Sequence, residues 1–187
     1  KTRTKSMNAF SSIDYPDVAL IRDGRILHYI LQGKPPMPPV FHDKLDANVF
    51  VLRLIPGMNP DVLRPLANRF DALVIESFGV GGLPCYEQAD FLSAASAWSS
   101  AGKPIVITTQ VPHEGSDLAV YQVGARVAAQ PGILQAYTMT AEAVVTKLMW
   151  ILPQTRDLVQ IKRLFYTPIA CDLLLFEEHG QHTDESN

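Results

Sequence analysis

The sequence predicts an α/β fold, a small doubly wound parallel sheet of about four strands flanked by helices. Three observations predict it. Short apolar runs rich in β-branched residues alternate with segments whose apolar residues recur at helical spacing. Asp23-Gly24 separates two β-rich runs, which is typical of a tight β-hairpin turn. The stretch from Gly33 to Pro39 holds four prolines in five residues, so we expect a linker there.

The segment after the linker begins with a predicted strand and helix. Val49–Ile55 is a nearly continuous apolar run, typical of a strand buried on both faces. Asn59-Pro60 then predicts a helix start, because asparagine is a favoured N-cap and proline fits the first helical position. Apolar residues between positions 62 and 70 fall on one face of that helix.

Two further strands follow in the same rhythm. Ala72–Ser77 and Pro104–Thr109 are apolar and β-branched, and the helix that separates them starts near Phe91 and ends at Gly102. Three strands separated by two helices make two βαβ units. Short connections of this kind predict parallel strands with right-handed crossovers.

The remainder is predicted to be mostly helical. Ser116 is a candidate cap for a helix over 120–127, and residues 132–137 are a candidate short fourth strand. Thr140 is expected to cap the next helix, and residues 158–165 read as a last amphipathic helix.

Composition excludes several classes of function. The formal net charge of −3 supplies no electrostatic reason to bind nucleic acid. No apolar run reaches the roughly 18 residues that span a bilayer, and the first apolar stretch is too short for a signal peptide. The two cysteines, Cys85 and Cys171, favour a reducing compartment. We therefore expect a cytoplasmic protein that binds neither nucleic acid nor membrane.

A glycine-rich loop formed by Gly79, Gly81 and Gly82 is the most suggestive candidate site. It follows the carboxyl end of a predicted buried strand, where open α/β sheets bind ligands. Its spacing is not G-x-G-x-x-G and no Walker lysine follows, which disfavours a nucleotide. A tight turn without ligand, a small-ligand loop and a subunit contact remain open.

Other chemistry-bearing residues are fewer. Thr108 and Thr109 end the third strand beside the glycine loop, where their hydroxyls either hold a polar ligand or satisfy backbone groups. Residues 113–117 have the side chains for acid–base work, but a hydrophilic loop is the preferred reading. His179 and His182 lack a third ligand, so we predict no metal and no cofactor.

Four stretches in a fixed order carry a resemblance: 4–12 (TKSMNAFSS), 75–84 (IESFGVGGLP), 121–124 (YQVG) and 139–148. Together they resemble the C-terminal half of bacterial L-asparaginases, in particular the cytoplasmic type I branch, over roughly residues 1–165. The resemblance implies a larger N-terminal domain joined by a linker to a smaller domain with a flavodoxin-like sheet.

The same resemblance implies that this chain lacks the catalytic residues. Family members carry a nucleophilic threonine in T-G-G-T and a second threonine and an aspartate in H-G-T-D-T, and neither motif occurs here. We therefore expect no catalytic residue in this chain, while the full-length enzyme hydrolyses L-asparagine to L-aspartate and ammonia. Residues 1–39 become the end of a missing N-terminal domain, the hairpin and the linker; residues 40–176 the C-terminal domain; and 177–187 a polar tail.

The resemblance also implies partners and a site. In this family the C-terminal domain of a neighbouring subunit helps to close the substrate pocket, so we expect a homo-oligomer, the missing N-terminal domain and L-asparagine as partners. The expected substrate-binding or interface residues are Gly79, Gly81, Gly82, Thr109, Tyr121 and Gln122. Glu76 stands where type I members that bind asparagine allosterically commonly have arginine, and a glutamate would repel the ligand's carboxylate.

Two alternatives remain open from the sequence. The first is a free-standing module of asparaginase-like fold that binds a small ligand or oligomerises without catalysis. The second is an amidotransferase subunit related to asparaginases, which the near-neutral charge does not support. The preference for asparagine or glutamine cannot be read, because the discriminating pocket lies mostly outside this sequence.

Overall fold

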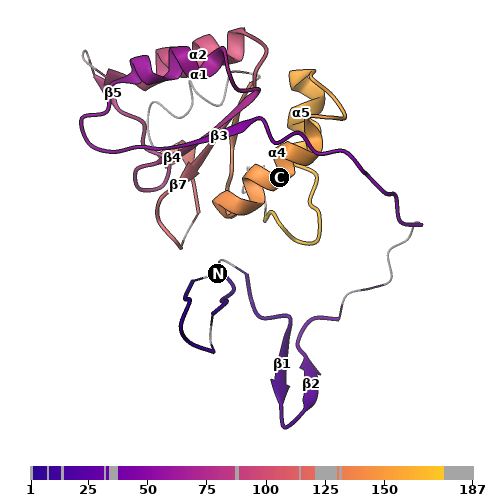
Figure 1. Ribbon diagram of the computed structural model, residues 1–187. Helices are drawn as coiled ribbons and strands as arrows, with labels where there is room; N and C mark the ends of the chain where they lie inside the picture. The colour runs from indigo at the N-terminus through magenta and orange to yellow at the C-terminus, as the bar shows by residue number, and fades with distance from the viewer. Residues whose placement is uncertain are drawn as a thin grey trace, which may run out of the picture.

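The structure is a computed structural model, built around a parallel sheet with helices on both faces (Figure 1). It describes all residues except 1, 8, 14, 32, 34–37, 87–88, 114, 121–129, 131 and 175–187. The sheet has four strands in the order β3-β4-β7-β8, so neighbours in space are also successive along this part of the chain. Their bounds are β3 Val49–Arg53, β4 Ala72–Ser77, β7 Ile105–Thr109 and β8 Ile133–Gln135. The predicted α/β fold class is confirmed.

Each face of the sheet has its own apolar core. On one face, Leu73 and Ile75 of β4 pack with α1 (Leu63–Ala67) and α2 (Phe91–Ser100). On the other, Ala72 and Val74 of β4 pack with α4 (Ala141–Ile151) and α5 (Leu158–Phe165). Side chains alternate between the faces of a strand, and all four of these β4 residues are fully buried. The second helical layer is supplied by the two helices that follow the last strand.

The helices begin where the sequence predicts. Asn59 accepts a hydrogen bond from the Asp61 amide at 2.9 Å and opens a 3₁₀ turn, η1 (Pro60–Val62), that leads directly into α1. Thr140 caps α4 by accepting from the Ala143 amide at 3.3 Å. Asp157 caps α5 in the same way, through the Gln160 amide at 2.9 Å. None of the described helices is long and apolar enough to cross a bilayer.

The predicted hairpin is confirmed. Strands β1 (Ala19–Arg22) and β2 (Arg25–His28) are antiparallel, and both turn residues, Asp23 and Gly24, have positive φ. The hairpin stands apart from the central sheet (Figure 1). In its register Ile21 lies opposite Ile26, and both side chains are exposed. The linker prediction falls largely on residues outside the described part of the chain.

Three details differ from the expectations. The run 49–55 is not buried on both faces: β3 is an edge strand that pairs only with β4, so Val51 is 40% exposed, and Ile55 lies beyond the strand's end. Ser116 caps no helix, since a 3₁₀ turn, η2 (Leu118–Val120), follows it and the rest of the expected helix lies outside the described residues. A two-residue ladder between β5 (Cys85–Tyr86) and β6 (Ala89–Asp90) carried no sequence signal.

Lys147 anchors the chain after α5 to α4. Its side chain is only 3% exposed, and its Nζ lies 2.8 Å from Asp172 Oδ2. The same ammonium donates to the Thr167 carbonyl at 2.8 Å and stands 5.8 Å from the centre of the Phe165 ring. This lysine therefore replaces its lost hydration with a carboxylate, a carbonyl and an aromatic face.

Substituting Lys147→Met should lower the free energy of unfolding by about 2–3 kcal/mol, because it leaves Asp172 and the Thr167 carbonyl without their cation. Asp172 keeps 21% of its side chain exposed, which places the effect at the low end of the range for buried pairs. Urea denaturation measures it. The double variant Lys147→Met/Asp172→Asn should recover part of the loss, and a double variant less stable than the single one would contradict this account.

Tyr166 predicts a loss of stability at alkaline pH. Burial raises the pKa of Tyr166 to about 12, and its Oη accepts from the Gln135 amide at 2.9 Å. Between about pH 10 and 12 the unfolded chain loses this proton while the folded chain keeps it, so the free energy of unfolding falls as pH rises, by at most about 1.4 kcal/mol per pH unit. Urea denaturation at pH 9 and pH 11 should show a smaller fall for Tyr166→Phe than for the parent. Tyr29→Phe, which alters an exposed ring, should leave the fall unchanged.

Candidate functional site

The candidate site lies at the carboxyl edge of the sheet, where the loops after β4 and β7 meet. The loop after β4 is a tight turn: the Phe78 carbonyl accepts from the amides of Gly81 at 3.1 Å and Gly82 at 2.7 Å. Gly79 and Gly81 have φ of 51° and 131°, conformations that residues with a side chain rarely adopt. The amides of Gly81 and Gly82 are therefore used within the loop itself, as in the tight-turn reading.

Close packing also explains the glycine at position 81. A Cβ built there would stand 2.8 Å from Cδ2 of Leu118, closer than carbon atoms approach without displacement. The neighbouring Val80 carbonyl accepts from the Asp117 amide at 2.6 Å. The glycine loop is thus held against the segment that leads into η2.

Thr109 joins the glycine loop to the end of β7. Its hydroxyl donates to the Gly79 carbonyl and accepts from the Val111 amide at 3.0 Å. Of the two roles considered for this hydroxyl, the structure shows the one that satisfies backbone groups. Gly79, Gly81, Gly82 and Thr109 are therefore brought together, whereas Tyr121 and Gln122 lie outside the described residues.

Gln110 holds the carboxyl ends of neighbouring strands in place. Its Nε2 donates to the carbonyls of Leu54, at 2.7 Å, and Glu76, at 3.0 Å. Its Oε1 accepts from Arg53 Nε at 3.4 Å. The sequence shows a glutamine after a predicted strand, but not which neighbouring carbonyls the fold would leave without partners.

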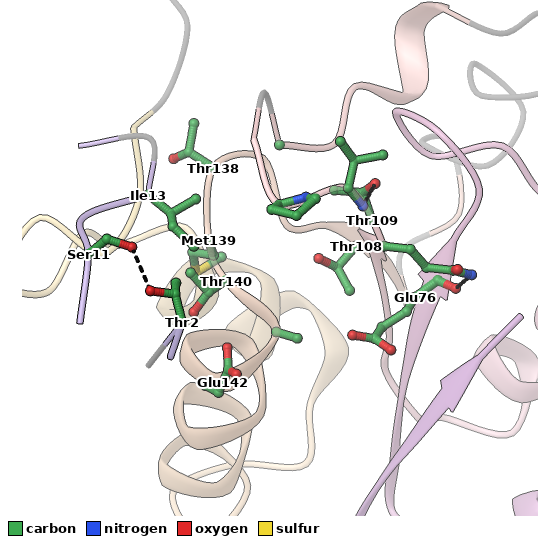
Figure 2. A pocket seen from close by; sticks show the side chains of 15 residues that line it. Thr2, Ser11, Ile13, Glu76, Thr108, Thr109, Thr138, Met139, Thr140 and Glu142 are labelled. Atoms are coloured by element: carbon green, nitrogen blue, oxygen red, sulfur yellow. Dashed lines mark hydrogen bonds between the residues drawn. The ribbon is translucent and has the colours of Figure 1, made fainter. Parts of the chain in front are cut away.

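A pocket of about 320 Å³ opens beside this edge (Figure 2). One wall is Glu76 and the residues from Thr108 to Pro112, and the second is the start of α4, from Thr138 to Glu142. The third wall comes from the N-terminal segment, through Thr2, Ser11 and Ile13. Sequence analysis noted Glu76 and Thr108 separately but did not bring them together with the start of α4.

A second cavity, of about 460 Å³ and more open, lies on the other side of the glycine loop. Its lining is apolar apart from backbone atoms and comprises Pro56, Gly57, Met58, Phe78, Gly82, Leu83 and Pro84. The glycine loop therefore stands between a polar pocket and an apolar one.

The segment from His113 to Asp117 acts mainly through its backbone. Ser116 donates its amide to the Tyr137 carbonyl at 2.8 Å, which fastens this segment to the chain before α4. His113 is exposed. Within the part of the chain that the structure describes, no three His, Cys, Asp or Glu side chains gather closely enough to hold a metal ion.

Comparison with known proteins identifies the family. The profile of the glutaminase/asparaginase C-terminal domain matches residues 48–165. The chain belongs to that family. It is 40% identical over 176 residues to the L-asparaginase of Thermococcus kodakarensis, a match that covers 92% of this chain and 52% of that protein. The predicted resemblance is confirmed.

Solved structures show the same relationship. The thermostable L-asparaginase from Thermococcus kodakarensis superimposes with a TM-score of 0.87 and 38% identity, over 94% of this chain and 53% of that one. The L-asparaginase I from Vibrio cholerae shares the fold, with a TM-score of 0.75 and 24% identity over 89% of this asparaginase family member and 50% of that chain. The chain therefore spans about half the length of these relatives.

A related class of protein also matches. A glutamyl-tRNA(Gln) amidotransferase polypeptide from Metallosphaera sedula is 31% identical over 128 residues, covering 68% of this family member and 28% of that relative. Both the identity and the coverage are lower than for the Thermococcus kodakarensis L-asparaginase.

The packing of Gly81 yields a testable prediction. Gly81→Ala should destabilise the chain by about 1–3 kcal/mol, because its Cβ meets Leu118 and its φ is unfavourable for alanine. Gly102→Ala is the matched control, since φ is also positive there but no atom lies within 4 Å of the added Cβ. Urea denaturation compares the two. Equal losses of stability would show that Leu118 yields to the added methyl group and that close packing is not the constraint at position 81.

Proposed function

We propose that this chain is the C-terminal domain of an L-asparaginase that hydrolyses L-asparagine to L-aspartate and ammonia. The observation that carries the proposal is the 40% identity to an L-asparaginase across 92% of this chain but only 52% of that relative. The T-G-G-T and H-G-T-D-T motifs are absent from the sequence. In the proposed enzyme an activated threonine outside this chain attacks the side-chain amide, ammonia leaves, and water releases aspartate.

The distribution of exposed apolar side chains supports a partner for the N-terminal part of this chain. Most large apolar side chains that are exposed in the described residues come before position 46. They are Met7, Phe10, Val18, Ile21, Ile26, Leu27, Tyr29, Leu31, Val40, Phe41 and Leu45. Apolar surface gathered in this way marks an interface, and we assign it to the preceding domain of the enzyme. On this proposal residues 1–39 belong with that domain and the α/β domain runs from 40 to 176.

The carboxyl edge of the sheet is the proposed contribution to the substrate pocket. The glycine loop (Gly79, Gly81, Gly82) and Thr109 form one fixed unit, and the apolar cavity beside Gly82 is open to a neighbouring surface. We place this unit, with Tyr121 and Gln122, at a subunit contact of a cytoplasmic homo-oligomer. Its role there is to hold a neighbour's pocket closed over L-asparagine, and the two exposed free cysteines fit a reducing compartment.

An amidotransferase component is the second candidate, because the match to the Metallosphaera sedula protein covers 68% of this chain. The two functions differ in a measurable way. An asparaginase releases ammonia from free L-asparagine without any nucleic acid. If the reconstituted protein instead required tRNA for ammonia release, the second candidate would replace the first.

Ammonia release from L-asparagine tests the proposal directly. The purified chain should be inactive alone and should become active when co-expressed with the polypeptide encoded upstream of Lys1. Activity of the chain by itself would overturn the assignment, because the catalytic threonines would then have to lie within it. So would an inactive complex in which both halves are folded.

Variants of the hairpin test the proposed interface. Ile21→Lys/Ile26→Lys places two charges on the exposed face of β1 and β2, where Ile21 pairs with Ile26. This variant should fold as the parent does but recover at least 10-fold less activity on complementation, because burial of two ammonium groups is costly. Val159→Lys, a similarly exposed apolar residue on α5, should leave complementation unchanged.

A further inference from the structure

We propose that the pocket of Figure 2 binds a small organic cation, a primary amine carrying a hydroxyl or similar polar group. We name it the carboxylate pocket and define it by five side chains: Glu76, Thr108, Thr138, Thr140 and Glu142. All five belong to this chain, so the inference stands independently of the proposed function and of any upstream domain.

The size and position of the cavity suit a small molecule. Its volume of about 320 Å³ lies at the lower end of the range for small-ligand sites. It lies where β4 and β7 end and α4 begins, the edge at which open α/β sheets bind ligands. Figure 2 shows Glu76 and Glu142 on different walls, one from the sheet and one from the helix.

The charge of the lining selects a cation. Glu76 and Glu142 both line the pocket, and none of its described lining residues is a lysine, arginine or histidine. The cation nearest to Glu76 is Arg53, at 3.9 Å, and its side chain is 61% exposed, so water screens much of the attraction. No ion pair to Glu142 occurs among the described residues. Two carboxylates without a close counter-charge repel an anion and attract an ammonium group.

Thr108 supplies an independent sign of a ligand. The residue is 2% exposed, and its hydroxyl has no hydrogen-bond partner among the described residues. Figure 2 shows its oxygen directed into the space between the two walls. The hydroxyls of buried residues are normally hydrogen-bonded, as Ser77 is at the same edge, where it donates to the Thr108 carbonyl at 2.6 Å. A ligand hydroxyl or ammonium group in the pocket would complete Thr108.

The threonines at the start of α4 complete the recognition. Thr140 accepts from the Ala143 amide and Thr138 from the Leu174 amide, at 3.3 and 3.0 Å, so both hydroxyl protons can still be donated. The partial positive charge of this helix end is offset by the Thr140 cap and by Glu142 in the first turn. The pocket therefore offers two carboxylates for an ammonium group and several hydroxyls for a polar substituent. A bare metal ion fits less well, because the described residues bring no three carboxylate, histidine or cysteine side chains together.

Titration with ethanolamine at neutral pH, followed by amide chemical shifts in the full chain, tests the proposal. Ethylene glycol is the matched neutral probe, because it replaces the ammonium group by a hydroxyl. We expect saturable shifts centred on residues 108–111 and 139–142 with ethanolamine, and at least 10-fold weaker binding of ethylene glycol. Equal binding of the two probes, or no saturation by ethanolamine up to 50 mM, would overturn the inference.

Variants separate the contributions of the pocket from general charge effects. Glu76→Gln and Glu142→Gln should each weaken ethanolamine binding about 10-fold, and Thr108→Val about 5-fold, the scale of one lost charged or neutral hydrogen bond. Asp43→Asn, which removes an exposed carboxylate away from the pocket, is the control with the same change in net charge and should bind as the parent does. Loss of binding in the control alone, or L-asparagine binding more tightly than ethanolamine without dependence on Glu76, would contradict a cation site.

Discussion

The fold depends on the burial of β4 on both faces. Leu73 and Ile75 belong to one core and Ala72 and Val74 to the other, and none of the four is exposed. Burying each of the larger side chains contributes about 1.5–3 kcal/mol, and the strand's backbone groups pair with β3 and β7. A strand covered by helices on both faces has no free face for a ligand. Binding is therefore confined to the loops and strand ends at the edge of the sheet.

That edge is held together by side chains that substitute for missing backbone partners. Gln110 donates to carbonyls at the ends of two neighbouring strands, and Ser77 donates to the Thr108 carbonyl. Thr109 links the end of β7 to the glycine loop. Because these polar groups are already satisfied, the edge is rigid, and the hydroxyl of Thr108 is distinguished from them by having no partner among the described residues. Rigidity and one hydroxyl open to a ligand are what a preorganised binding surface requires.

Membership of the asparaginase C-terminal domain family places these features in a larger protein. The α/β domain satisfies its own apolar residues within two cores, whereas the described residues before position 46 leave many of theirs exposed. This contrast agrees with a chain that spans about half the length of its asparaginase relatives. The proposed division of labour follows: catalytic threonines come from outside this chain, and this domain supplies a fixed edge and an interface.

Local patterning in the sequence determined much of the fold. The Asp23-Gly24 turn, the caps Asn59 and Thr140 and the buried strand 72–77 were all predicted, because each depends on interactions within a few residues of the chain. Glycine spacing and order also identified the family. Tertiary structure alone decided the rest. The exposure of Val51 follows from the position of β3 at the sheet edge, and the carboxylate pocket joins Glu76 to Glu142 across more than sixty positions. Strand order and the convergence of distant loops are properties of long-range packing, and no local signal along the chain encodes them.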